Sequence, residues 1–274
     1  MTIKRSKPFY SKRVYFIGLS VLFLSIFFVN YAAAYDESFP VDMTEMVQAF
    51  NEGGKKISGG VDMTLISRYV WRGQYYTQGP GWQPEGFVSG YGFTGSVWGS
   101  MALGNEQYQG KFSEIDLSLI YAKEIYGLTI APGYVHYFYP VGGAASTGEL
   151  FLMLDYKFKY LHIFTSQFFD VKEYRKSYYG AFGVAFLYDF KERFSLKTAA
   201  STSWGDPRFN EAYFTVDKWT STVVSLDVSL GIEVLKWLFI KPGATYDIVV
   251  DGDLRKATGE PNLITVGVDV GFAF

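Results

Sequence analysis

The chain has 274 residues, of which 49% are hydrophobic and 19% aromatic, and it carries 25 basic and 27 acidic side chains. It contains no cysteine, which excludes disulfides, thiolate metal sites and a lipid anchor on cysteine. The slightly acidic balance argues against a nucleic-acid partner, and no motif requires a cofactor. We therefore expect no nucleic acid and no cofactor.

The N-terminus has the pattern of an export signal. Five basic residues precede an apolar run of 16 residues at 14–29, and Ala32 and Ala34 then have the spacing of a cleavage site. A membrane-spanning helix needs about 20 apolar residues, so we favour a signal peptide over residues 1–34 rather than a retained anchor. Removal of its five basic residues leaves 20 basic and 27 acidic residues, a net charge of −7.

Residues 35–57 are predicted to form a periplasmic segment with a short helix. Asp42 and Glu45 have the spacing of a capping box, and Gly53 and Gly54 would end the helix. The apolar face would consist of Met43, Met46, Val47 and Phe50. Three roles remain open for this segment: it lies on the barrel rim, it plugs the lumen, or it only links the signal to the barrel.

Twelve segments of alternating polarity follow. Each is about the 9–11 residues that a tilted strand needs to cross the hydrocarbon, or slightly longer. After the signal no apolar run is long enough for a membrane-spanning helix, although hydrophobic residues are 49% of the chain. The predicted strands are 58–71, 82–92, 95–104, 112–122, 127–139, 148–158, 161–170, 177–189, 194–204, 221–234, 238–249 and 262–274.

The connections between these strands alternate in length. The gaps after the even-numbered strands are short, whereas most of the others are longer and reach 205–220 and 250–261. Outer-membrane barrels have short periplasmic turns and longer outside loops, and a soluble sandwich has no reason to sort its loops in this way. The sequence therefore predicts an all-β protein: a transmembrane antiparallel up-and-down β-barrel of about twelve strands over residues 58–274.

The alternation also assigns the two faces of the strands. A charge on the lipid face costs about 2–4 kcal/mol at the bilayer midplane, so the charged positions must face the lumen. Acids outnumber bases at the predicted lumen positions, which predicts a weak preference for cations. Small residues at other lumen positions would leave room inside the barrel: Gly231, Gly267, Gly271 and Ala273. The predicted pore-lining residues are Asp62, Arg68, Arg72, Glu114, Asp116, Glu149, Asp155, Lys197, Asp227, Lys241, Asp247 and Asp269.

Two features of individual strands carry further predictions. Arg68 and Arg72 share a face of the first strand, where they could form a basic ladder that tunes the pore. They could also form ion pairs that stiffen the wall, with Asp62, Glu114 or Asp116 as partners, and we favour this structural role combined with some tuning of the pore. Pro132 and Pro242 predict local breaks in strand pairing, because proline has no amide proton to donate.

Five short motifs follow one another in a fixed order. They are SRYVWRG at 67–73, QP at 83–84, VWGS at 97–100, SEID at 113–116 and GYVHYF at 133–138. This order resembles the TorF-like family of outer-membrane porins, in which an S-R-Y-x-x-R-G stretch is followed by a glutamine, a W-G-S or W-G-N strand, an acidic E-x-D strand and an aromatic G-Y strand. The match covers most of residues 60–140. The resemblance implies a porin-type barrel, but the family has no assigned substrate and supplies no solute.

Motifs for catalysis, cofactors and metals are weak. The G-x-G-x-x-G at 90–95 is followed at once by a strand rather than a helix, so it indicates a tight turn. A barrel phospholipase would have a serine two residues after its histidine, and neither His136 nor His162 has one. We therefore do not expect an enzyme. The segment 251–253 resembles a calcium loop but lacks its other ligands, so we expect a polar turn.

The last ten residues, TVGVDVGFAF, alternate to the end of the sequence. We expect this strand to pair with the first strand and close the barrel, which removes the edges of the sheet. Phe272 and Phe274 are the predicted signal for the barrel-assembly machinery, with outer-membrane lipid as the other partner.

Taken together, these patterns predict a channel for passive diffusion of small hydrophilic solutes, located in the outer membrane. The alternative is a closed barrel with a structural, adhesion or partner-binding role through its extracellular loops.

Overall fold

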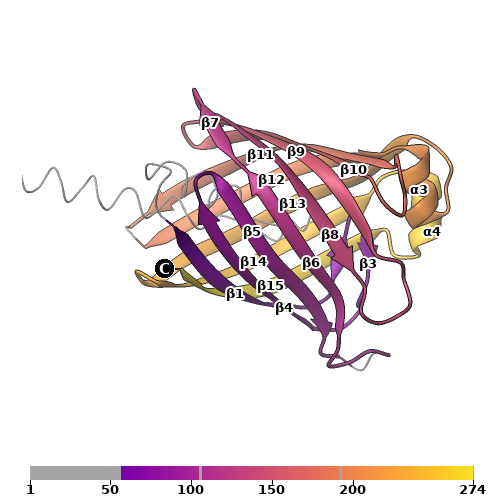
Figure 1. The fold of residues 1–274 in the computed structure, drawn as a ribbon, viewed down its shortest axis with the longest axis horizontal. Coiled ribbons are helices and arrows are strands. Elements are labelled where there is room, and N and C mark those ends of the chain that lie inside the picture. The colour runs from indigo at the N-terminus through magenta and orange to yellow at the C-terminus, as the bar shows by residue number, and fades with distance from the viewer. Residues whose placement is uncertain (1–56, 105–106, 192, 274) are drawn as a thin grey trace, which may run out of the picture.

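The computed structural model describes residues 57–104, 107–191 and 193–273. The predicted signal peptide, the predicted helix before the barrel and Phe274 lie outside these residues. Twelve long strands dominate the described part (Figure 1). They are β1 (Ser58–Ile66), β4 (Gly81–Gly90), β5 (Phe93–Ala102), β6 (Phe112–Tyr121), β8 (Leu128–Phe138), β9 (Thr147–Phe158), β10 (Leu161–Asp170), β11 (Tyr178–Phe190), β12 (Phe194–Gly205), β13 (Thr220–Leu235), β14 (Leu238–Val249) and β15 (Asn262–Ala273).

The smaller elements lie between these strands. β2 (Val70–Trp71) and β3 (Gln74–Tyr75) form a separate small hairpin between β1 and β4. β7 (Lys123–Ile125) continues the direction of β6, and two helices, α3 (Pro207–Phe214) and α4 (Gly252–Thr258), lie in the last two long loops. Figure 1 shows both helices at the same end of the tilted strands, which we call the long-loop end; the opposite end is the short-turn end.

The sheet closes on itself. The strands pair antiparallel with their neighbours in the chain, and β15 pairs with β1 through Gly271 opposite Asp62 and Val270 opposite Met63. The predicted antiparallel barrel is therefore confirmed, including the pairing of its last strand with its first. One boundary is wrong: the predicted strand 58–71 ends at Ile66, because residues 67–80 leave the wall.

The two faces of the barrel differ as the alternation predicts. On β15, Val266 and Val268 are exposed, whereas Asp269 is only 5% exposed and faces inward. The other strands repeat this pattern, with outward Leu119, Leu150 and similar residues forming an apolar belt of the kind that contacts lipid. Among the described residues, no helix is long and apolar enough to cross a membrane.

Both predicted prolines interrupt the strand pairing. The ladder between β8 and β6 ends at Gly133, next to Pro132, and resumes only where β7 pairs with β8. The ladder between β13 and β14 skips the positions around Pro242. The predicted breaks are confirmed, and the first of them explains why β6 and β7 are separate.

The glycine motif at 90–95 forms a tight turn, as predicted. Gly90 pairs with Phe93, so only Tyr91 and Gly92 lie between β4 and β5. Both have positive φ values, 57° and 83°, which a two-residue hairpin of this twist requires.

Gly271 does not leave an open space in the lumen. The ring of Phe239 lies over it, and a Cβ at this position would overlap both that ring and the carboxylate of Asp62. The expectation of free room at Gly271 is therefore wrong: the glycine is needed because an aromatic side chain from β14 fills the place of its own side chain.

Gly271→Ala is expected to lower the free energy of unfolding by about 1–3 kcal/mol, because overpacking forces Phe239 from its position. The measurement is the urea midpoint of the barrel folded in lipid vesicles. Gly86→Ala is the matched control, since a Cβ there meets nothing within 4 Å. Equal midpoints for the two variants would contradict this explanation of Gly271.

Candidate functional site

Residues 67–80, which we call the mouth loop, fold into the barrel at its long-loop end. Tyr69, Val70, Trp71 and Arg72 are all buried, although they lie in a loop. The loop turns at Arg72 and Gly73, which connect the paired strands β2 and β3. Both residues have positive φ values, 49° and 85°. A bulky residue rarely adopts positive φ, so the contacts of the buried Arg72 must offset this cost.

Arg72 forms a buried ion pair with Glu149 of β9. Its two terminal nitrogens donate to the two carboxylate oxygens over 2.9 and 2.8 Å, and Tyr137 donates to Oε2 of the same carboxylate over 2.8 Å. Bidentate pairs of this kind are among the stronger hydrogen-bonded contacts in proteins. Burial favours the neutral guanidine, but the charge of Glu149 outweighs it and raises the pKa of Arg72 above its usual range.

Aromatic rings surround the guanidinium of Arg72. Its central carbon lies 4.3 Å from the ring centroids of Trp71 and Tyr179, 4.5 Å from Phe168 and 5.6 Å from Phe209. A desolvated cation over aromatic faces gains about 2 kcal/mol or more. These rings come from the mouth loop, two wall strands and α3, so Arg72 joins four separate parts of the chain.

The mouth loop reaches both sides of the barrel. On one side, the Tyr69 hydroxyl donates to Oε2 of Glu114 on β6 over 2.9 Å, and its ring lies 5.7 Å from Trp98 on β5. On the other side, a Cβ at Gly73 would lie 2.5 Å from Val223 on β13 and 3.3 Å from Val249 on β14. The loop therefore crosses the mouth from wall to wall and narrows it.

Helix α3 packs on the mouth loop. Asp206 caps its N-terminus by accepting from the amide of Phe209 over 2.9 Å, and Pro207 follows at the first helical position. Phe209 is fully buried between Trp71 and Tyr179, and the Gln74 amide donates to the carbonyl of Tyr213. This helix was not predicted, although the Asp-Pro pair was a usable signal for its start.

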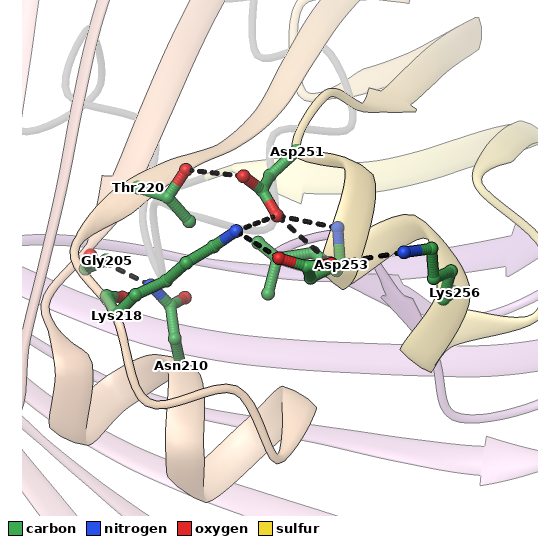
Figure 2. A network of polar contacts seen from close by, with 8 residues as sticks. Gly205, Asn210, Lys218, Thr220, Asp251, Asp253 and Lys256 are labelled. Atoms are coloured by element: carbon green, nitrogen blue, oxygen red, sulfur yellow. Dashed lines mark hydrogen bonds and ion pairs between the residues drawn. The ribbon is translucent and has the colours of Figure 1, made fainter.

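A cluster of charges joins the loop after α3 to helix α4 (Figure 2). Lys218 Nζ lies 2.8 Å from Asp251 Oδ1 and 2.6 Å from Asp253 Oδ2, and the Thr220 hydroxyl donates to Asp251 over 3.0 Å. Asp251 also accepts from the amides of Asp253 and Leu254, so it caps α4. The predicted polar turn at 251–253 is thus wrong, because these residues begin a helix. We call Lys218, Asp251 and Asp253 the outer latch.

Acid is expected to release the outer latch. Partial burial favours neutral Asp251, but hydrogen bonds from Lys218 and two backbone amides outweigh it and lower the pKa of Asp251 from 3.8 to about 2. Because the folded pKa is depressed, the stabilisation is complete above about pH 4 and is lost as the pH falls toward 2. Pepsin cleavage of 206–220, normalised to an unstructured peptide, should rise over this interval.

Two variants separate the latch from general acid unfolding. Lys218→Ala should make the same segment susceptible already above pH 4. Lys256→Ala should not, since its one ion pair among the described residues is with the exposed Asp253. If cleavage of both variants followed the wild-type pH dependence, Lys218 would have no part in holding these loops.

The predicted pore-lining residues fall into two groups. Arg68 and Arg72 do not lie on a barrel strand, and their proposed partners Asp62, Glu114 and Asp116 are not the ones found. Arg68 lies at the rim and pairs with Glu260 over 2.9 Å, while Arg72 pairs with Glu149. The others lie on the inward-facing positions of their strands: Asp62, Glu114, Asp116, Glu149, Asp155, Lys197, Asp227, Lys241, Asp247 and Asp269.

Several of these inward residues contact one another across neighbouring strands. Lys241 lies 3.6 Å from Asp269, which also accepts from Thr64 over 3.3 Å. Asp227 accepts from Thr245 over 2.7 Å, and Ser225 donates to Asp247. These contacts distribute polar groups along the wall formed by β13, β14, β15 and β1.

Glu85 is an inward carboxylate that was not among the predicted pore-lining residues. It lies on β4 directly opposite Asp62 of β1 and Trp98 of β5. The polarity of 82–92 does not alternate clearly, because Trp82 and Pro84 on one face are matched by Phe87 on the other. When both faces of a strand carry apolar residues, the alternation does not show which face points into the lumen. Only the strand register identifies Glu85 as a lumen residue.

The two histidines lie on different faces. His136 shares the outward face of β8 with Tyr134, whose hydroxyl is 2.8 Å from its Nδ1. His162 faces inward on β10 with its Nδ1 2.8 Å from Asp155. Within the described residues, no three His, Cys, Asp or Glu side chains are arranged to hold a metal ion.

Comparison with known proteins supports the fold. No family model matches the chain, and no curated protein matches it. The chain is similar to the NanC porin structure, with 13% identity, a TM-score of 0.50, and coverage of 78% of this chain and 98% of that one. Weaker likenesses are the KdgM porin (11% identity, TM-score 0.48, coverage 78% and 99%) and the COG4313 outer membrane channel from Pseudomonas putida F1 (9%, 0.43, 80% and 95%). Because these sequence identities are low, the comparison shows a similar fold and nothing further.

Proposed function

We propose that this barrel is a porin-like outer-membrane channel through which small hydrophilic solutes diffuse passively. The observation that carries the proposal is the inner face of β12–β15. Its side chains are small or polar, and several of them, Ala199, Ser201, Ser225, Gly243 and Gly267, are partly exposed although they point inward. Solvent access to inward positions supports a hydrated path along this wall.

The mouth loop sets the size limit in this proposal. It narrows the long-loop end, where Arg72 and its aromatic neighbours occupy the β8–β11 side of the barrel. The remaining path would follow the polar side, which suits small solutes rather than large ones. The same loop also favours the alternative, a closed barrel with a structural or partner-binding role, if the path beside it does not conduct.

The membrane orientation follows from the loops. Outer-membrane barrels place short turns in the periplasm and longer loops outside, so the mouth loop and outer latch would face the exterior. Phe272 stacks on Trp237 at 6.0 Å near the short-turn end, where an aromatic girdle belongs. Phe272 and Phe274 remain the proposed signal to the barrel-assembly machinery, and membership in the TorF-like family remains a proposal that rests on the ordered motifs.

The charge of the lumen predicts ion selectivity and tests the channel proposal. Inward carboxylates outnumber inward cations, so cations should be favoured in a hydrated lumen. In a planar bilayer with a potassium chloride gradient, the purified, refolded barrel should give a reversal potential of the sign expected for cation preference. Anion preference would contradict the proposed path, because it would mean that ions do not pass the acidic wall.

A further inference from the structure

A row of carboxylates lies on the inner wall just below the mouth loop. The register places Asp62 of β1 opposite Glu85 of β4, Glu85 opposite Trp98 of β5, and Trp98 opposite Asp116 of β6. Three acids thus lie on four adjacent strands with one indole between them. We call these four residues the acidic row.

This row is one inward position deeper than the contact between the mouth loop and the wall. Glu114, two residues before Asp116 on the same face, accepts from Tyr69 of the mouth loop, and Tyr69 also packs on Trp98. Because β6 runs from the long-loop end to the short-turn end, Asp116 lies below this contact. The row therefore lies below the mouth loop and adjoins the wall of the proposed path, because β1 pairs with β15.

Two acids of the row, Glu85 and Asp116, have no ion-pair partner among the described residues. The neighbouring Glu114 forms no ion pair among these residues either. The guanidinium of Arg72 pairs with Glu149 instead. Buried carboxylates without an ion pair are costly, so Glu85 and Asp116 favour a cationic partner.

Unpartnered polar atoms point to where such a partner would bind. Asp116 is 8% exposed and Ser100 1% exposed, yet Oδ1 of Asp116 and the Ser100 hydroxyl have no hydrogen-bond partner. Oε1 of Glu85 is unpartnered as well. Ser100 lies opposite Glu114, on the same inner face as Trp98. Buried polar atoms of this kind normally have partners, so three in one region indicate a ligand that completes them.

The arrangement favours an organic cation over a metal ion. Among the described residues, no group of carboxylates is close enough to form a metal site. The row instead holds acids on both sides of an indole, and the Trp98 side chain is only partly buried. A guanidinium group pairs bidentately with a carboxylate and stacks on an indole face, which matches this row.

We propose that Glu85, Trp98 and Asp116 form a binding site for small solutes that carry a guanidinium or primary ammonium group. The proposal deepens the proposed function, since it names the class of solute that the channel would select. In this site the cation neutralises Glu85 and Asp116 and lies against Trp98, and Ser100 accepts a hydrogen bond from it.

The test is equilibrium binding of methylguanidinium to the refolded barrel in detergent micelles, measured by calorimetric titration. The wild-type barrel should bind it in a saturable way, whereas N-methylurea, its uncharged analogue, should not bind. Glu85→Gln/Asp116→Asn should weaken binding at least tenfold. Asp227→Asn, which removes an inward carboxylate on the opposite wall, should leave it unchanged. Equal binding of N-methylurea, or unchanged binding in the double variant, would overturn the proposal.

The two proposals can fail separately. The binding measurement needs no ion flow, so saturable binding to a barrel that does not conduct would support the site and reject the channel. Conductance without binding would support the channel and reject the site. If the double variant does not fold, as judged by its migration before and after heating, Glu85→Gln and Asp116→Asn are measured singly. Each should weaken binding, and the comparison with N-methylurea on the wild type remains decisive.

Discussion

Arg72→Met is expected to lower the free energy of unfolding by about 3–5 kcal/mol, because it leaves the carboxylate of Glu149 buried without its cation. Both side chains are nearly inaccessible, at 2% and 3% exposure. The substitution also removes the cation from four aromatic rings, although methionine fills much of the same volume. The measurement is the urea-induced unfolding of the barrel in lipid vesicles, followed by tryptophan fluorescence.

Two comparisons make this result specific to the buried pair. Arg68→Met breaks the partly exposed pair with Glu260 and should cost no more than about 1 kcal/mol. Arg72→Met/Glu149→Gln should recover part of the loss, since glutamine carries no charge and can still accept from Tyr137. Equal losses for Arg68→Met and Arg72→Met would show that the pair with Glu149 does not hold the mouth loop in place.

Replacing residues 69–77 with a Gly-Ser linker of equal length is expected to raise single-channel conductance roughly twofold or more, since the loop narrows the mouth of the barrel. The substitution removes Trp71 and Arg72 from the long-loop end and leaves every barrel strand intact. The measurement is the conductance of the refolded variant in a planar bilayer, with folding confirmed by its shift in migration on heating.

The matched control replaces a loop that does not cross the mouth. Residues 140–146, between β8 and β9, are mostly exposed, and a Gly-Ser linker there should leave the conductance unchanged. If the mouth-loop variant folded and conducted no better than the wild type, the constriction would have to lie elsewhere in the barrel.

The barrel could be predicted from the sequence because its signals are local. Each strand shows its period in about ten residues, and the sorting of short turns and long loops needs only the spacing of those strands. Closure by β15 followed from the uninterrupted alternation of its residues, and the breaks at Pro132 and Pro242 followed from the missing amide proton.

The site could be predicted only in part because its contacts are not local. The alternation of Leu65, Tyr69 and Trp71 suggested one continuous strand, yet the chain leaves the wall after Ile66 and turns at Arg72 and Gly73. The partner of Arg72 is 77 positions away and is determined by the arrangement of the whole barrel. Glu85 completes the acidic row, but it lies on a strand whose polarity pattern does not show which face points into the lumen.

The unexpected packing over Gly271 has the same origin. A glycine on a lumen position predicts space when only its own strand is considered. Phe239 fills that space from the neighbouring strand, and nothing in the local sequence of either strand indicates the overlap. Pairing register therefore decides whether a small residue opens the lumen or accommodates a larger neighbour.

The most direct test of the channel proposal is the single-channel conductance of the purified, refolded wild-type barrel in a planar bilayer. A hydrated path along β12–β15 beside the mouth loop predicts small, steady, discrete current steps. A barrel that is folded and inserted, as judged by its resistance to unfolding before heating, but carries no current would contradict the proposal and favour the closed barrel.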